Sequence, residues 1–375
     1  MNADRLGFYL VGWKKFYNKT LALLESKKVG YDINWIFNDK IYDLIDWSVE
    51  IPTSITELYR QRAVQLRNKY DYLALQYSGG ADSNNVLHAF IDNGIFLDEI
   101  VMQLPEPDRK NFNNQDTTER NVNGEIDFEA TPHLQKYKDK IHPNTKIRYQ
   151  DYSKPLLELL THDNWFEKTP TGSNMCLTGV ARQITQVSDP EILNLAYQGK
   201  TVGLIQGVDK PLVYFDGNHY YAYFSDLNAM HNAPAELNLQ EIFSKFYCTE
   251  FFYWTPDMPE IVVKQAQLIK QFAESNPHAK DMLSKSRKIH VKHFKPLVHP
   301  IIYPPHTEPT FQTDKPSFKI FRDVDSWFWG VATEQQKGNY LSTIEYIGKN
   351  IDESRFIDQS IDNGMQATLS KFYRL

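Results

Sequence analysis

The distribution of apolar residues along the chain predicts an α/β fold built on a parallel sheet. Residues 72–77 form a mostly apolar run without polar alternation, which is typical of a strand buried on both faces. After a short polar loop, apolar residues recur at helical spacing over residues 86–91, and Asn93 and Gly94 end this helix. Three later runs are predicted to be strands of the same sheet: residues 98–104, 145–150 and 201–206.

The pattern divides the chain into three regions. Residues 1–65 are rich in aromatic residues and are expected to form an N-terminal α/aromatic extension. Residues 66–230 hold the predicted parallel strands. Residues 231–375 are expected to form a C-terminal, mainly helical domain, because amphipathic spacing is clear there. A final helix is expected near residues 367–373.

A capping box marks the helix that precedes the first parallel strand. Ser54 and Glu57 have the spacing of this motif. Arg60 and Arg62 follow in the same helix and are expected on its exposed face, with a phosphate contact as the alternative.

Composition narrows the classes of protein that the sequence fits. The 375-residue chain has a net charge of −6, which gives no overall electrostatic attraction to nucleic acid. Its two cysteines, Cys176 and Cys248, are too few for a disulfide framework. No apolar stretch approaches the length of a membrane span, and no signal-peptide pattern opens the chain. A cytoplasmic protein is therefore expected.

The candidate chemistry lies in the loop between the first parallel strand and its helix. The sequence of this loop is Ser78-Gly79-Gly80-Ala81-Asp82-Ser83. Its glycines let the backbone approach an anion closely, and the free amides and dipole of the following helix favour phosphate oxygens. Asp82 fits beside phosphates when a Mg²⁺ ion lies between the anions. The alternative is an ordinary Gly-Gly turn with a Ser/Asp helix cap.

This strand–loop–helix unit resembles the PP-loop of the N-type ATP pyrophosphatase superfamily, which includes asparagine synthetase, tRNA-lysidine synthetase and 7-cyano-7-deazaguanine synthase. The resemblance implies a Rossmann-like parallel sheet of the adenine nucleotide alpha hydrolase (HUP) type over residues 66–230. It also implies that the loop residues bind ATP: Ser78, Gly79, Gly80, Ala81, Asp82 and Ser83. Asn84 departs from the pattern, because relatives often carry Ser or Thr there. The chain is also loosely similar to unassigned PP-loop proteins of large tailed phages, which would place it in the host cytoplasm.

The same resemblance assigns roles to residues that follow the predicted strand at 201–206. It implies that Gly207 admits a close backbone approach in the ATP site, and that Asp209 joins Asp82 in holding Mg²⁺ through ATP. Lys210 would neutralise phosphate charge. Arg182, on a predicted helix, would contact phosphate or acceptor, so Asp82, Lys210 and Arg182 are the candidate catalytic residues. The alternative is a turn at the strand end, with Arg182 in a surface salt bridge.

The implied reaction is ATP-dependent adenylation. An acceptor oxygen on a carboxylate or carbonyl group attacks the α-phosphate, and a nucleotide or base is among the candidate acceptors. Pyrophosphate leaves, and an amine then displaces AMP. The expected ligands are ATP, Mg²⁺, a small-molecule acceptor and an amine donor. No amidotransferase domain fits, so ammonia would come free or from a separate subunit. The alternatives are a tRNA- or other nucleic-acid-modifying enzyme and a non-catalytic ATP-binding module.

Two further segments each have more than one interpretation. Residues 105–131 are polar and long, which is typical of a lid over a site or of a disordered loop. Residues 287–306 are rich in His and Lys; a solvated face is favoured there over a patch for nucleic acid or another partner. A zinc site is not favoured in that stretch because cysteine partners are lacking.

Overall fold

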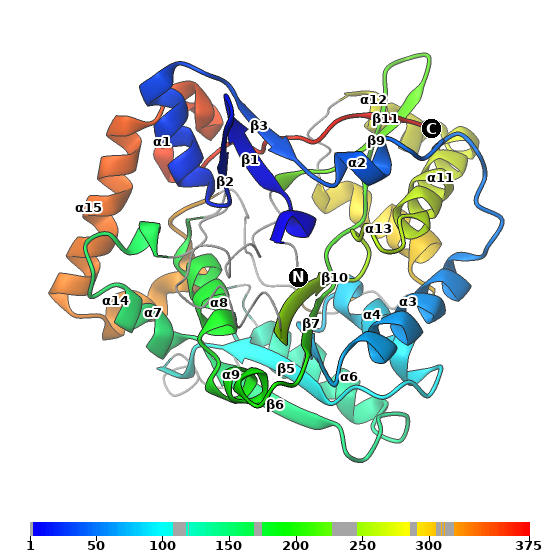
Figure 1. Cartoon of the computed structure of the whole chain (residues 1–375), viewed down its shortest axis with the longest axis horizontal. Coiled ribbons are helices and arrows are strands. Elements are labelled where there is room, and N and C mark those ends of the chain that lie inside the picture. The colour runs from blue at the N-terminus through cyan, green and yellow to red at the C-terminus, as the bar shows by residue number, and fades with distance from the viewer. Residues whose placement is uncertain are drawn as a thin grey trace.

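The computed structural model of the chain describes residues 3–107, 118, 120–168, 175–226, 246–285, 291–304, 309, 311 and 319–375. At its centre lies a five-stranded parallel sheet with strand order β10-β7-β4-β5-β6 (Figure 1). Its strands are β4 (Tyr72–Gln76), β5 (Glu99–Leu104), β6 (Lys146–Asp151), β7 (Val202–Gln206) and β10 (Tyr247–Phe251). The α/β class and the four predicted strands are confirmed, and β10 is a fifth strand that the sequence pattern does not predict.

Strand β10 comes from the region expected to be mainly helical. It pairs in parallel with β7 from Tyr247 to Phe251, and every residue of the strand except Cys248 is buried. The charged Glu250 therefore lies inside the protein. The central sheet thus takes strands from both residues 66–230 and residues 231–375.

Helices cover both faces of the central sheet. α3 (Ile55–Lys69) and α4 (Ala81–Ile91) pack on one face as part of the main core. α8 (Leu177–Val187) and α9 (Pro190–Tyr197) contact a smaller apolar cluster on the other face. The buried members of that cluster are Ala74, Val101, Ile192, Val202, Leu204 and Tyr247.

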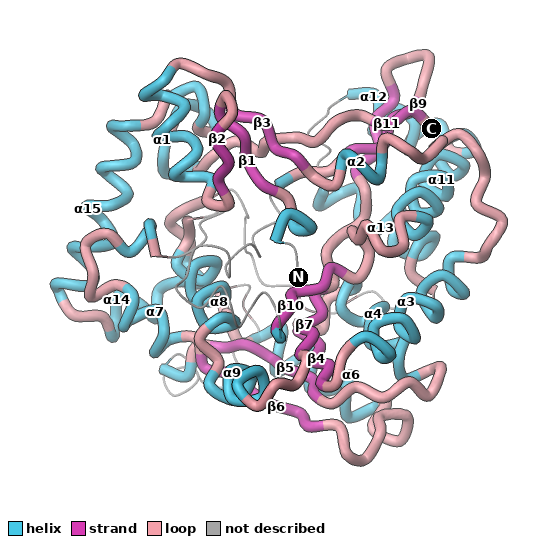
Figure 2. Tube along the Cα trace, viewed as in Figure 1, coloured by secondary structure: helices cyan, strands magenta, loops and turns pink. Residues whose placement is uncertain are grey.

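Two small antiparallel sheets lie apart from the central sheet (Figure 2). The first has the order β2-β1-β3 and contains β1 (Phe8–Val11), β2 (Lys14–Phe16) and β3 (Ile33–Ile36). The second has the order β11-β9-β8 and contains β8 (Leu212–Phe215), β9 (Tyr220–Tyr223) and β11 (Tyr373–Arg374). The N-terminal extension therefore contains strands as well as helices.

The prediction of a final helix near residues 367–373 is wrong. Residues 373–374 instead pair with β9, and Leu369 forms a bridge with Ser225. Tyr373 is buried while Arg374 is exposed, which is the two-residue alternation of a strand. The ring of Tyr373 stacks on Trp47 at 4.8 Å between centroids, so tertiary packing sets the extended conformation.

The remaining helices complete the layers around the sheets. The N-terminal half holds α1 (Lys19–Val29), α2 (Asp39–Tyr42), a π-helix (Glu125–Ala130), α6 (Thr131–Lys136) and α7 (Ser153–Leu159). The C-terminal half holds α11 (Glu260–Ser275), α12 (Pro277–Lys285), α13 (Val291–Ile302), α14 (Ser326–Val331) and α15 (Glu334–Asn350). Short 3-10 turns occur at Ala3–Leu6, Trp165–Glu167, Asp323–Asp325, Glu353–Arg355, Ile357–Gln359 and Ile361–Asn363. None of the helices in the described ranges is long and apolar enough to span a membrane.

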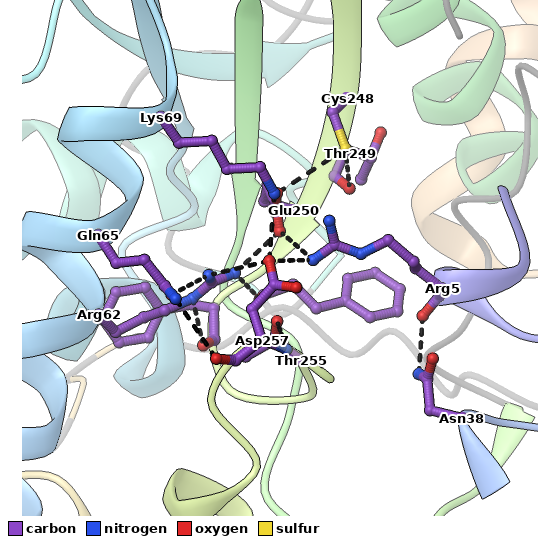
Figure 3. Close-up of polar contacts among 12 residues, drawn as sticks. Arg5, Asn38, Arg62, Gln65, Lys69, Cys248, Thr249, Glu250, Thr255 and Asp257 are labelled. Carbon is purple, nitrogen blue, oxygen red and sulfur yellow. Dashed lines mark hydrogen bonds and ion pairs between the residues drawn. The ribbon is translucent and has the colours of Figure 1, made fainter. Parts of the chain in front are cut away.

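A buried ion cluster ties α3 and the N-terminus to β10 (Figure 3). Three cations donate to the carboxylate of Glu250: Arg62 at 2.9 Å, Lys69 at 2.6 Å and Arg5 at 3.3 Å. Burial by itself would raise the pKa of Glu250, but these cations lower it to about 2. Arg62 is fully buried, so its expected place on an exposed face is wrong. Its charge is compensated by a carboxylate 188 residues away in the sequence.

Candidate functional site

The candidate site lies at the carboxyl edge of the central sheet, between β4 and β7. From β4 the chain proceeds to β5 and β6 on one side, whereas β7 and β10 lie on the other side. In open parallel sheets, ligands bind outside the carboxyl ends of the strands where the strand order reverses in this way. The loop after β4 contains the glycine motif, and Gly207 follows β7 directly.

Gly79 shapes the loop after β4. Its φ is +77°, and a Cβ at this position would lie 2.6 Å from the backbone nitrogen of Ala130. Only glycine meets both conditions without a shift of the backbone. Asn84 Nδ2 donates to the Gly79 carbonyl at 2.8 Å, and the hydroxyls of Ser78 and Ser83 lie 3.3 Å apart. The loop is thus held by its own polar side chains.

Helix α4 begins directly after this loop. Gly80 is its N-cap, and no side chain caps the helix. The backbone N–H groups of the first turn have no intrahelical acceptor, and with the helix dipole they favour an anion. A Cβ on Gly207 would lie 3.2 Å from the backbone nitrogen of Ser83. The close approach observed at Gly207 is therefore between the end of β7 and the first turn of α4.

Lys210 joins two carboxylates beside this turn. Its Nζ lies 3.1 Å from Asp82 Oδ1 and 2.7 Å from Asp209 Oδ1. Burial would lower the pKa of Lys210, but Asp209 and Asp82 raise it above its ordinary value. The ammonium group is therefore charged at neutral pH.

Asp82 is also charged, because cations outweigh the effect of burial. Burial raises the pKa of its carboxyl, whereas Lys210, Lys295 and His299 lower it, and the net result lies below the ordinary value. Lys295 and His299 belong to α13, in the basic stretch for which a solvated face is the favoured interpretation. His299 is buried, so that interpretation is wrong for His299.

Two stacked tyrosines hold Asp82 from the C-terminal region. Tyr303 Oη donates to Asp82 Oδ1 at 2.6 Å, and Tyr253 Oη donates to the Asp82 backbone carbonyl at 3.0 Å. The two rings are stacked at 5.3 Å between centroids, and Asn85 Nδ2 donates to Tyr253 Oη at 2.8 Å. No sequence motif identifies either tyrosine, because both reach Asp82 only through the tertiary fold.

The acidic side chains of the described residues do not form a metal cage at this site. Among the described residues, no group of three or more His, Cys, Asp or Glu side chains could hold a metal ion. Mg²⁺ bound to phosphates needs only one or two carboxylates. Asp82 fits this role. Its Oδ1 accepts hydrogen bonds from Lys210 and Tyr303, whereas its Oδ2 accepts none from the described residues. Asp209 lies near Asp82, because both carboxylates accept a hydrogen bond from Lys210 Nζ.

Arg182 lies over a different part of the carboxyl edge. Its carbonyl accepts from Gln103 Nε2 at 3.4 Å, and its guanidinium carbon lies 6.0 Å from the centre of the Tyr152 ring. Gln103 belongs to β5 and Tyr152 follows β6, so Arg182 is on the β5–β6 side. Over the described ranges, no hydrogen bond or ion pair joins Arg182 to Asp82 or Lys210.

The segment expected to be a lid is described in part. Residues 125–130 form a π-helix, and the backbone of Ala130 packs on Gly79. Residues 108–117 and 119 of the same segment, and residues 287–290 and 305–306 of the basic stretch, lie outside the described residues.

Neither cysteine has the environment of a nucleophile. Burial raises the pKa of the Cys176 thiol to about 11, and burial also raises the pKa of the Cys248 thiol to about 11. A reactive thiolate requires a lowered pKa. Covalent sulfur chemistry at these residues is therefore not supported.

Comparison with known proteins adds no relative to this description. The sequence matches no protein-family model and no curated protein. The place of the loop in the sheet and the contacts of Asp82 are the observations from which a function is inferred.

Proposed function

We propose that the protein is an ATP pyrophosphatase of the PP-loop kind, with a central sheet of the HUP type, that adenylates an acceptor oxygen. One observation carries the proposal. An ionised aspartate, Asp82, lies in the first turn of an uncapped helix after a glycine loop, with a buried lysine at 3.1 Å. This combination offers amides, a cation and a carboxylate at one sheet edge, which suits a magnesium–polyphosphate ligand.

The described residues suggest how the charges would be arranged during the reaction. The amides of the first turn of α4 bind phosphate oxygens, and Lys210 neutralises negative charge that develops on the departing pyrophosphate. Asp82 would hold the Mg²⁺ of Mg-ATP, and the ion would supply neutralisation of phosphate charge. Asp209 and Tyr303 hold Lys210 and Asp82 in place.

In the reaction proposed here, the acceptor oxygen forms a bond to the α-phosphorus, and the bond between the α-phosphorus and the bridging oxygen breaks. Pyrophosphate leaves with that electron pair. An amine then forms a bond to the adenylated carbon and loses a proton to solvent, while the bond between that carbon and the acceptor oxygen breaks and AMP leaves with the oxygen and the electron pair. Catalysis rests on positioning and charge neutralisation, so no enzyme nucleophile is required.

Analysis of the nucleotide products tests this function. The protein is incubated with Mg-ATP, with and without a small-molecule extract of the producing cells, beside the variant Asp82→Asn and the control Asp216→Asn in the exposed β8–β9 turn. AMP and pyrophosphate that increase with extract, persist in Asp216→Asn and disappear in Asp82→Asn would support the proposal. ADP and phosphate would contradict it, and tight ATP binding without turnover would favour a non-catalytic module. Salt-sensitive binding of RNA or DNA together with AMP formation would favour the nucleic-acid-modifying alternative.

A further inference from the structure

Two histidines are in direct contact between α4 and α6. The Nε2 atoms of His88 and His133 lie 3.1 Å apart, and the two rings meet edge to face. His88 is buried, and its Nδ1 lies 2.9 Å from an oxygen of Asp92, which also accepts from Lys140 Nζ at 2.7 Å. The ring of Tyr137 lies 4.8 Å from each histidine ring, measured between centroids. The proposed reaction uses neither histidine.

The contact between the two rings has room for one proton. Lys140 and His88 lower the pKa of Asp92 below its ordinary value although burial raises it, so this carboxylate only accepts and His88 Nδ1 carries a hydrogen. The Nε2 atom of His88 then either accepts, in a neutral ring, or donates, in a charged one, and His133 supplies the opposite group. If both rings were charged, two N–H groups would face each other at 3.1 Å. The hydrogen bond would be lost and the two positive charges would repel.

The surroundings of the pair disfavour that second charge. Partial burial, the neighbouring ring of His88 and the ammonium of Lys136 lower the pKa of His133 to about 4. From the side of the π-helix, Glu129 and burial raise the pKa of Tyr77, so its hydroxyl stays protonated at neutral pH. At neutral pH the two histidines therefore keep their hydrogen bond, and Tyr77 remains a donor.

Two contacts connect this pair to the glycine loop. The ring of His133 lies 6.4 Å from the ring of Tyr77 between centroids, and the Tyr77 hydroxyl donates to Asn84 Oδ1. Asn84 Nδ2 in turn donates to the carbonyl of Gly79 at 2.8 Å. Ala130, whose backbone packs on Gly79, directly precedes α6 and lies three residues before His133. The segment that the histidines hold against α4 is thus the one that supports the loop.

We infer that the His88–His133 pair positions the glycine loop, and that it does so only while the two rings share a single proton. A second proton separates α6 from α4, and the backbone of Ala130 then moves away from Gly79. Acid therefore releases the loop from its support. The consequence for ATP rests on the proposed function, because that function assigns the loop to the phosphates.

The direction and size of the effect follow from the protonation of His133. Its pKa is about 4 with α6 in place and returns to the ordinary 6.5 when α6 is released. Between these two values the released state binds more protons, so release becomes more favourable as the pH falls. From pH 7.5 to pH 5.5 the equilibrium constant for release should rise about tenfold.

Amide hydrogen exchange of the ligand-free protein measures this release directly, since exchange reports local opening. Protection factors, corrected for the intrinsic effect of pH on exchange, are compared at pH 7.5 and 5.5 for residues 125–136, with α15 as the internal reference. The variant is His133→Gln, because a carboxamide donates to or accepts from His88 without titrating. The matched control is His162→Gln in the exposed turn after α7.

Protection of residues 125–136 should fall about tenfold at pH 5.5 in the original protein and in His162→Gln, with α15 unchanged. It should be independent of pH in His133→Gln. Protection that does not change with pH in the original protein would overturn the inference, and so would an equal fall in His133→Gln. The first of these results needs no variant, so the inference remains testable if His133→Gln does not fold.

A second measurement separates this inference from the proposed function. Saturating Mg-ATP should restore the protection of residues 125–136 at pH 5.5 in the original protein, because a ligand that binds only the supported loop stabilises it. A pH-dependent release that Mg-ATP leaves unchanged would retain the positioning pair and refute the assignment of the loop to ATP. AMP formation that depends on Asp82, in a protein whose protection does not change with pH, would retain the function and overturn the pair.

Discussion

Replacing Tyr303 with Phe should weaken Mg-ATP binding without removing the charge of Asp82. The hydroxyl of Tyr303 donates to Asp82 Oδ1 at 2.6 Å, while its ring stacks on Tyr253 and is retained in the variant. A hydrogen bond to a charged group contributes about 1.5–3 kcal/mol, and 1.4 kcal/mol corresponds to a factor of ten. Loss of a hydrogen bond that orients a metal-binding carboxylate typically costs ~10- to 100-fold in affinity. We therefore expect the Kd for Mg-ATP to rise by a factor in that range.

The pH dependence of Mg-ATP binding should not change in Tyr303→Phe, because the charged side chains around Asp82 remain. Lys210, Lys295 and His299 still lower the pKa of Asp82 after the hydroxyl is removed. The carboxylate therefore stays ionised at neutral pH, and Mg-ATP binding between pH 6 and 8 should keep the pH dependence of the original protein. The loss arises from orientation alone.

Isothermal titration of Mg-ATP into Tyr303→Phe measures this effect, with Tyr340→Phe as the matched control. Tyr340 is also fully buried, and its hydroxyl donates to the Met175 carbonyl at 3.1 Å, so the same atom is removed at another place. Tyr303→Phe should lose about 1.5–3 kcal/mol of unfolding free energy because its acceptor is charged, and Tyr340→Phe should lose about 1 kcal/mol. Unchanged affinity in Tyr303→Phe, or an equal loss in Tyr340→Phe, would refute the role of the hydroxyl at Asp82.

Three further predictions concern the loop and the buried ion cluster. Gly79→Ala should abolish measurable ATP binding and should lower Tm more than Gly30→Ala does. The φ angle is positive at both glycines, but of the two only Gly79 has a backbone atom 2.6 Å from the new Cβ. ATP titration measures the first effect and thermal unfolding the second. Arg62→Met should cost about 3–5 kcal/mol in chemical denaturation because it leaves Glu250 buried without its closest guanidinium, whereas a loss below about 1 kcal/mol would show that the cluster contributes little. The pKa of Glu250 is lowered from 4.5 to about 2, which should contribute about 3 kcal/mol to the free energy of unfolding. This contribution is fully present above pH 4.5 and is lost as the pH falls toward 2. Acid unfolding of Glu250→Gln should lack this part of the pH dependence.

The parallel strands were predictable because each buried strand is a continuous, mostly apolar run of neighbouring residues. Residues 72–76 and 202–206 are continuous runs with few polar positions, and such runs occur where both faces of a sheet are covered. β10 could not be found in this way, since Glu250 interrupts it. That residue is buried only because Arg62 and Arg5, which are 188 and 245 residues away in the sequence, compensate its charge.

The candidate site was predictable to the extent that it lies in one loop. The spacing of Gly79 and Asp82 identifies the turn and its carboxylate from neighbouring residues, and the strand before them places the loop at a sheet edge. Tyr303 and Tyr253 contact Asp82 across 221 and 171 residues of sequence, and nothing local distinguishes them from other packed aromatic residues. Their hydroxyl contacts depend on how α13 and β10 dock against α4.

Exchange of labelled pyrophosphate into ATP tests the central claim most directly. Adenylation with release of pyrophosphate is reversible, so in the presence of Mg-ATP and an acceptor-containing extract, and without added amine, the protein should incorporate labelled pyrophosphate into ATP. Asp82→Asn should abolish the exchange. Incorporation of labelled phosphate in place of pyrophosphate, or release of γ-phosphate with no exchange, would contradict cleavage between the α and β phosphates at this site.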